Sequence, residues 1–137
     1  MPLQKKLRRR FNLSLNGKNI LVIDDTHSIR TFVRLILEEA NYNIVEAENG
    51  AIGIEKFKSN IFDLVITDIY MPVSSGLEVV VQLEKEYPNT KIIVLSDGGK
   101  ENFSNDLNVC EALGASCFLS KSKIKDELLT LVNDILK

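Results

Sequence analysis

Cysteine, proline and long apolar runs are scarce in this chain of 137 residues, and each scarcity excludes a class of protein. The two cysteines, Cys110 and Cys117, are too few and too far apart for a C-x-x-C metal or redox motif, which favours two reduced thiols in the core. No apolar run reaches about 18 residues, so the sequence predicts no membrane span. The basic N-terminus is not followed by an apolar segment long enough for a signal peptide, and the cytoplasm is the expected location.

The net charge of −2 conceals an uneven distribution of bases, because the first 18 residues contain six of the 17 bases and no acid. We expect residues 1–17 to form a basic extension and residues 18–137 to form one globular domain. The extension is expected to be a flexible tail, with a short amphipathic helix as the alternative, because apolar residues recur in it at every fourth position. An acidic partner, an anionic membrane surface and nucleic acid stay open as its ligands. No DNA-reading module accompanies the bases, so no DNA-binding domain is expected.

Five short runs rich in Ile and Val predict five strands that are covered on both faces. They are ILVID (20–24), YNIVEA (42–47), DLVITD (63–68), KIIVLS (91–96) and SCFLS (116–120). Apolar residues recur between and after these runs at helical spacing. The stripes are Ile29, Phe32, Val33, Ile36, Leu37 and Ala40; Ala51, Ile54 and Phe57; Leu77, Val80, Val81 and Leu83; a weaker set in 101–113; and Ile124, Leu128, Leu131, Val132, Ile135 and Leu136. This alternation predicts an α/β fold of three layers, a doubly wound (βα)5 sandwich with a parallel five-stranded sheet.

Polar side chains follow or end four of the predicted strands. Asp24 and Asp25 follow the first, Asp68 ends the third, Ser96 ends the fourth, and Lys121 follows the fifth. Ligands of open parallel sheets bind at the carboxyl ends of the strands, so we expect these side chains to meet at one edge. Three crowded carboxylates repel one another unless a cation lies among them, and Mg²⁺ prefers such hard oxygen ligands. The hydroxyl and the ammonium would complete a site for a phosphoryl group.

Each of these residues also has a simpler interpretation. Asp24 and Asp25 could cap the helix that starts near His27, where acids are favourable. Ser96 alone could be an ordinary hydroxyl at a strand end, and Lys121 alone could be a solvated lysine. His27 is expected to be exposed and without a role in the site. The combination of all the strand-end residues favours the functional interpretation.

The order of the motifs makes the chain resemble the receiver domain of two-component response regulators, the single-domain chemotaxis-type branch included. The resemblance covers about residues 18–137. It depends on LVIDD (21–25), VEAENG (45–50), DLVITDIYMPVSSG (63–76), VLSDGG (94–99) and LGASCFLSK (113–121). The resemblance implies a flavodoxin-like receiver fold and membership of a phosphorelay signal transduction pathway.

The resemblance also implies a role for each acid. Asp68 would be the phosphoacceptor, receiving a phosphoryl group as an aspartyl phosphate from a sensor histidine kinase, a histidine phosphotransfer protein or a small phosphodonor. Asp25 would bind Mg²⁺ directly, Asp24 would bind it through a water molecule, and Asp68 and the backbone carbonyl of Tyr70 would be further ligands. The chain would catalyse its own phosphorylation and dephosphorylation without being a turnover enzyme.

Switching and output are implied in the same way. Ser96 and Lys121 would each contact a phosphoryl oxygen, and Phe118 would change rotamer as Ser96 is drawn toward the phosphoryl group. The output face would comprise the fourth helix, the fifth strand and the fifth helix. It would bind a downstream protein, and a homodimer through the same face is a further expectation.

Three residues depart from the family pattern. Ser122 follows Lys121 where the family usually has proline, so the Lys121–Ser122 peptide is either a strained cis bond or an ordinary trans bond. Asp97 follows Ser96 where a small residue is usual, and Tyr70 is bulky where the family varies. Both side chains are expected to change the lifetime of the phosphorylated state.

Other functions compete with a phosphorylated switch. A phosphorelay intermediate and a degenerate receiver that acts without phosphorylation share the fold. An aspartate-nucleophile phosphatase would need D-x-D after the first strand, whereas Asp24 and Asp25 are adjacent. A flavodoxin-like FMN binder would need a phosphate loop rich in Ser, Thr and Gly, where this chain has DDTHSIR.

Overall fold

A computed structural model describes residues 17–71, 75–97, 112 and 114–137. All five predicted strands are present as β1 (Asn19–Ile23), β2 (Asn43–Ala47), β3 (Leu64–Asp68), β4 (Ile92–Ser96) and β5 (Cys117–Ser120). They form one parallel sheet in the order β2-β1-β3-β4-β5. Runs of Ile, Val and Leu suit the central strands β1, β3 and β4, which are buried along their whole length, while the edge strands β2 and β5 are partly buried.

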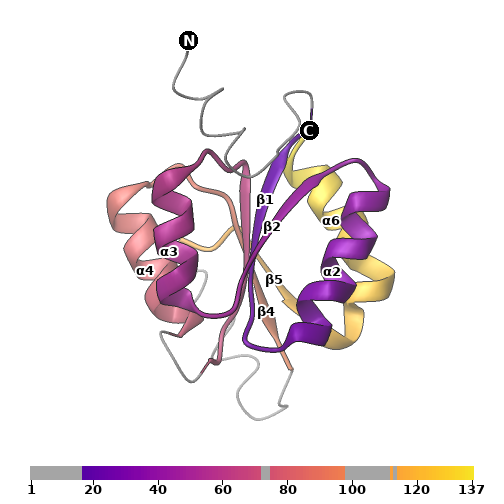
Figure 1. Ribbon diagram of the computed structural model, residues 1–137, viewed down its shortest axis with the longest axis horizontal. Coiled ribbons are helices and arrows are strands. Elements are labelled where there is room, and N and C mark those ends of the chain that lie inside the picture. The colour runs from indigo at the N-terminus through magenta and orange to yellow at the C-terminus, as the bar shows by residue number, and fades with distance from the viewer. Residues whose placement is uncertain (1–16, 72–74, 98–111, 113) are drawn as a thin grey trace.

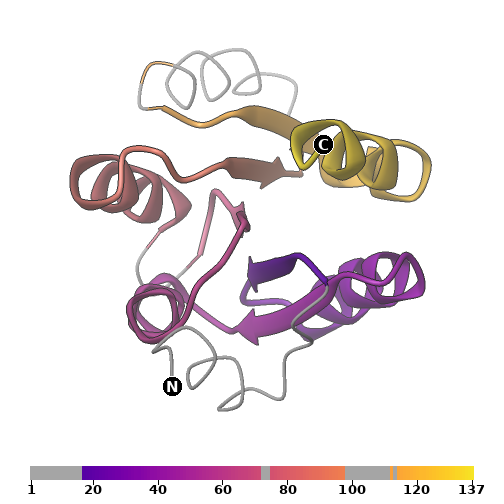
Figure 2. The ribbon, with the colours of Figure 1, turned by 90° about the horizontal axis from the view of Figure 1, so that it is seen from above.

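Helices pack on both faces of the sheet, which confirms the doubly wound α/β fold. α2 (His27–Glu39) and α6 (Ile124–Ile135) cover one face, and α3 (Gly50–Ser59) and α4 (Gly76–Glu86) cover the other (Figure 1). Figure 2 shows the three layers from above. A one-turn 3₁₀ helix, η1 (Lys121–Lys123), precedes α6. Of the weak helix expected in 101–113 only Ala112 is described, and it is helical, while the basic extension up to residue 16 lies outside the described residues.

Two apolar clusters separate the sheet from its helices because successive side chains of a strand point to opposite faces. On one face, Val33 and Leu37 of α2 pack with Ile20, Val22 and residues of α6. On the other face, residues of α3 and α4 pack with Leu21 and Ile23. β1, β3 and β4 are buried along their whole length, so these central strands position the chain that follows them.

Three residues of the predicted helical stripes, Phe32, Ala51 and Val81, are exposed instead of buried. Phe32 of α2 is 40% exposed and Val81 of α4 is 45% exposed. Phe32 precedes the buried Val33, and Val81 follows the buried Val80. A step of one residue turns the side chain by about 100° around the helix axis, away from the direction of its buried neighbour. The buried strip of α4 is formed by Val79, Val80 and Leu83, and Val81 therefore points away from the sheet.

Side chains cap two of the helices at their N-termini. Asn49 accepts a hydrogen bond from the backbone N–H of Ile52 at the start of α3, and Ser75 accepts one from Glu78 at the start of α4. Such caps satisfy amide groups that have no partner within the helix. None of the helices in the described ranges is both long and apolar enough to cross a membrane.

Candidate functional site at the carboxyl edge of the sheet

The strand order places the predicted polar residues at one edge of the sheet. β2 lies on one side of β1 and β3 lies on the other, so the carboxyl ends of β1 and β3 form the switch point at which open parallel sheets bind their ligands. Asp24 follows β1, Asp68 ends β3 and Ser96 ends β4, and all three are buried. Burial of polar groups is costly unless they find partners, which marks this edge as unusual.

The three predicted acids converge. One carboxylate oxygen from each of Asp24, Asp25 and Asp68 lies within 4.8 Å of the others. Asp24 Oδ1 accepts a hydrogen bond from the backbone N–H of Thr26 at 2.8 Å. Asp24 therefore orders the turn into α2, while Thr26 occupies the N-cap position without a side-chain hydrogen bond. Neither Asp24 nor Asp25 is therefore the N-cap residue that was considered.

Lys121 reaches the acidic cluster from η1. Its Nζ atom lies 3.1 Å from Asp24 Oδ2, 3.4 Å from Asp68 Oδ1 and 3.8 Å from Asp97 Oδ1. The lysine side chain is mostly buried, whereas Asp97 is exposed at the rim. The described residues contain no cis peptide bond, so the Lys121–Ser122 peptide is trans. Lysine is thus placed between two buried carboxylates without the proline that the family usually has.

Burial and charge shift the ionisation of both partners in this ion pair. Burial and the neighbouring charge of Asp24 raise the pKa of Asp68 to about 6, although Lys121 opposes the shift. Burial lowers the pKa of Lys121, but the carboxylates of Asp24 and Asp68 raise it by more, and the net shift is upward. At neutral pH, Asp68 is therefore mainly ionised and Lys121 carries a positive charge.

The structure places the other predicted site residues around this cluster. Tyr70 lies two residues beyond Asp68 and its side chain is exposed. Phe118 of β5 is opposite Val94 of β4 and packs partly buried against the core on the α3 and α4 face. The metal-ligand role of the Tyr70 carbonyl and the switch roles of Ser96 and Phe118 stay predictions. His27 is exposed, as expected.

Gly76 is a structural residue of the site whose role the sequence could not reveal. A Cβ atom at this position would lie 1.9 Å from the backbone oxygen of Asp68 and 2.7 Å from its carbonyl carbon. The amide of Gly76 also donates a hydrogen bond to the oxygen of Ile69 at 3.0 Å. The start of α4 therefore packs directly on the backbone of the strand end that carries Asp68. The sequence showed Gly76 as the end of a motif but not what it contacts.

The raised pKa of Asp68 predicts how stability depends on pH in the absence of Mg²⁺. The folded protein keeps the proton up to about pH 6, whereas the unfolded chain loses it near the ordinary value of 3.8. Between these two pKa values the folded state therefore binds more protons than the unfolded chain. The contribution of Asp68 to the free energy of unfolding falls as the pH rises through this range. In EDTA, Asp68→Asn should raise the free energy of unfolding by about 1 to 3 kcal/mol at pH 7.5.

Urea unfolding of both proteins at pH 5 and pH 7.5 measures this effect. All other titrating groups are shared, so the difference between the two proteins isolates Asp68. We expect the gain from Asp68→Asn to be smaller at pH 5, where more of the wild-type carboxyl is protonated. A gain that is larger at pH 5 than at pH 7.5 would contradict the upward pKa shift.

Comparisons with known proteins agree with the fold and the acidic cluster. The family model for the response regulator receiver domain matches residues 20–133. The chain is 33% identical to the chemotaxis protein CheY of Thermotoga maritima, over 88% of this chain and 99% of that protein. It is 35% identical to the CAI-1 autoinducer sensor kinase/phosphatase CqsS of Vibrio cholerae, over 96% of this chain. It spans only 18% of the length of CqsS.

A solved structure has the same fold. The response regulator protein TrrA of Thermotoga maritima, solved in complex with Mg²⁺-BeF, superposes with a TM-score of 0.77 and 39% sequence identity. The superposition covers 87% of this chain and 99% of that chain. Together with the family match and the strand-end acids, it shows that this chain belongs to the response regulator receiver domain family of two-component signalling.

Proposed function

We propose that this chain is a single-domain, cytoplasmic response regulator that accepts a phosphoryl group on Asp68 in a Mg²⁺-dependent reaction. The donor is a sensor histidine kinase or a histidine phosphotransfer protein. The observation that carries the proposal is the position of Lys121, whose ammonium contacts the carboxylates of Asp24 and Asp68 beside a cluster of three acids. The proposed domain comprises residues 18–137, and residues 1–17 form its basic extension.

The residues at the sheet edge can carry out phosphoryl transfer by position and charge. An ionised oxygen of Asp68 attacks the phosphorus of a phosphohistidine, the new O–P bond forms, and the N–P bond breaks with its electron pair returning to the imidazole. The Lys121 ammonium pairs with one phosphoryl oxygen, and the Ser96 hydroxyl donates a hydrogen bond to another. Asp68 is consumed and regenerated by hydrolysis, so we assign the chain as a phosphoacceptor and not as a turnover enzyme.

The acids also fit a divalent cation. Asp24, Asp25 and Asp68 bring three carboxylates together, and among the described cations only Lys121 forms an ion pair with Asp24 or Asp68. Asp24 Oδ2 is buried and its described partner is the Lys121 ammonium at 3.1 Å, so a carboxylate oxygen still has capacity to accept from a metal-bound water. We assign Asp25, Asp68 and the Tyr70 carbonyl as direct ligands and Asp24 as a ligand through water. Bound Mg²⁺ would supply the positive charge that neutralises the phosphoryl oxygens.

The proposed output is a change in the surface around β5 and α6. Ser96 and Phe118 lie on the adjacent strands β4 and β5, so movement of one side chain can be transmitted to the other. The predicted helix in 101–113 would complete this surface, and of its residues only Ala112 is described. We assign this surface to a downstream protein and to a homodimer.

A phosphorelay intermediate is the second candidate, because the chain is similar over 96% of its length to part of a sensor kinase. A relay intermediate returns its phosphoryl group from Asp68 to a histidine, whereas a terminal regulator loses it to water. A degenerate receiver is less favoured because Asp24, Asp25, Asp68 and Lys121 are all present and in place.

Binding of Mg²⁺ to the unphosphorylated protein tests the metal site. Only the native state assembles the carboxylates, so a cation at tenfold its dissociation constant should stabilise the fold by about 1.4 kcal/mol. This corresponds to a rise in melting temperature of about 3 to 6 °C for a domain of this size. Asp25→Ala should remove the rise. Glu48→Ala also removes one negative charge, but at an exposed acid outside the cluster. The melting temperature of this variant should still rise when Mg²⁺ is added. An undiminished rise in Asp25→Ala would contradict the assignment of Asp25.

A further inference from the structure

Arg30 lies beside the acidic cluster but contacts none of its carboxylates among the described ion pairs. Its side chain extends from the first turn of α2 and is 13% exposed. Nη1 donates a hydrogen bond to the backbone oxygen of Asp24 at 2.6 Å, and Nε donates one to Glu46 Oε1 at 3.0 Å. Nη2 lies 3.3 Å from His27 Nδ1. The guanidinium therefore ties the backbone of the metal-binding turn to a carboxylate that is not part of the cluster.

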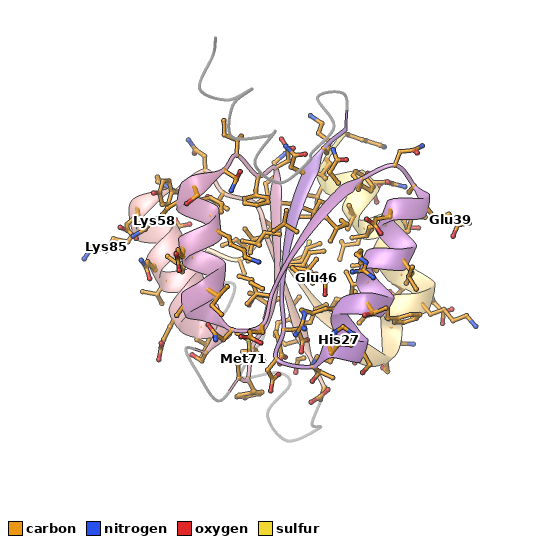
Figure 3. The ribbon with its side chains drawn as sticks, in the orientation of Figure 1. His27, Glu39, Glu46, Lys58, Met71 and Lys85 are labelled. Atoms are coloured by element: carbon orange, nitrogen blue, oxygen red, sulfur yellow. The ribbon has the colours of Figure 1, made fainter. Side chains whose placement is uncertain are left out.

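Glu46 reaches this arginine from the edge strand β2. It pairs in register with Val22, two residues before Asp24, and its side chain lies on the side of the sheet that faces α2 (Figure 3). Oε1 accepts from Arg30, and Oε2 pairs with Arg34. The carboxylate is thus fixed by two guanidinium groups of α2, and the side chain is only 21% exposed. A rigid, ion-paired glutamate at this place is well suited to hold Arg30 in one position.

The position of Arg30 affects the acids electrostatically. Guanidinium groups form strong bidentate pairs with carboxylates, and Arg30 already reaches the backbone of Asp24, one residue from Asp25. The three carboxylates of the cluster share the single Lys121 ammonium among the described ion pairs, so without Glu46 the preferred partners of Arg30 would be Asp24 and Asp25. An arginine paired with those carboxylates would occupy the oxygens that a divalent cation needs.

We propose that Glu46 is a positioning residue for the metal-binding turn. It holds the Arg30 guanidinium on the backbone oxygen of Asp24 and away from the carboxylates of Asp24 and Asp25, which stay available to Mg²⁺. The inference rests on the proposed function because it concerns the same metal site. It adds two residues, Arg30 and Glu46, to the set that determines the affinity of that site.

Isothermal titration of Mg²⁺ into the full chain at constant ionic strength tests this role. Glu46→Gln keeps the shape of the side chain but removes its charge, so Arg30 is released and the dissociation constant for Mg²⁺ should rise about tenfold. Glu38→Gln is the matched control, since it removes the same charge from a half-exposed partner of Arg34. This control should change the dissociation constant by less than about twofold, the range expected for a site without direct coupling.

A second mutation separates competition by Arg30 from a structural effect of Glu46. In an Arg30→Met background, Glu46→Gln should no longer weaken Mg²⁺ binding, because the competing cation is absent. Equal weakening in both backgrounds would overturn the proposal, as would unchanged binding in Glu46→Gln alone. A wild-type protein that binds no Mg²⁺ would overturn the proposed metal site and this inference together.

Variants of Arg30 keep the test valid if Glu46→Gln does not fold. Arg30→Lys retains a positive charge, but a single ammonium cannot reproduce the contacts to the Asp24 oxygen and to Glu46. Arg30→Met removes the charge. We expect the lysine variant to bind Mg²⁺ more weakly than the methionine variant, and urea unfolding in EDTA shows whether both are folded. Tighter or equal binding by the lysine variant would overturn the proposal.

Discussion

Asp68→Asn should abolish incorporation of phosphate when the protein is incubated with Mg²⁺ and acetyl phosphate. The amide has nearly the same shape as the carboxylate but lacks the ionised oxygen that attacks phosphorus. Because the mutation removes a charge from a crowded acidic cluster, the fold should be retained. Intact-mass spectrometry of the wild type should show the gain of one phosphoryl group per chain, and the variant should show none.

Asp97→Asn is the matched control for this experiment. It changes the charge in the same way at the exposed acid that lies 3.8 Å from Lys121 Nζ, and it should still be labelled. Stoichiometric labelling that persists in Asp68→Asn would place the nucleophile at another residue. Loss of labelling in both variants would show that the net charge of the cluster, and not the Asp68 nucleophile, limits the reaction.

Gly76→Ala should destabilise the fold by about 3 kcal/mol or more, because overpacking against rigid backbone is not relieved by side-chain rotation. The new Cβ atom would lie 1.9 Å from the backbone oxygen of Asp68, so α4 or the end of β3 must move. The movement displaces the phosphoacceptor, and the fraction that stays folded should be labelled more slowly. Urea unfolding gives the first effect and the rate of mass gain gives the second.

Gly53→Ala is a suitable comparison because Gly53 is also buried in the first turns of a helix. Its Cβ atom would lie 2.4 Å from Cδ1 and 2.8 Å from Cγ1 of Ile23, so it meets a side chain and not the backbone. The higher helix propensity of alanine offsets part of the cost. We expect a smaller loss of stability than for Gly76→Ala and normal labelling. A loss for Gly76→Ala no larger than that for Gly53→Ala would contradict the close contact between α4 and β3.

Much of the site follows from local sequence. Parallel strands all end on the same side of the sheet, so the sequence alone predicts that Asp24, Asp25, Asp68 and Lys121 lie at one edge. The expected convergence is present in the structure. The open question about the Lys121–Ser122 peptide could not be resolved in this way, because both isomers are compatible with the residues, and the structure has the trans form.

The sequence predicted which side of each helix faces the sheet, but not how wide the buried strip on that side is. Val33 and Leu37 of α2 are buried as their spacing indicates, but Phe32 between the same turns is exposed. An apolar side chain at the border of a stripe is buried only if a neighbouring element covers it. The position of that neighbour depends on tertiary packing and is not encoded in the spacing of one helix.

The sequence by itself determined the α/β fold, the parallel sheet and the identity of the strand-end acids, because strands and helices have periods of two and 3.6 residues that can be recognised locally. Only the tertiary structure decided which residues support those acids. Glu46 and Arg30 are 16 positions apart and belong to different elements, and Gly76 at the start of α4 lies against the backbone of Asp68 at the end of β3. Nothing in their own neighbourhoods marks them, since a contact between distant residues exists only after the strands and helices have packed together.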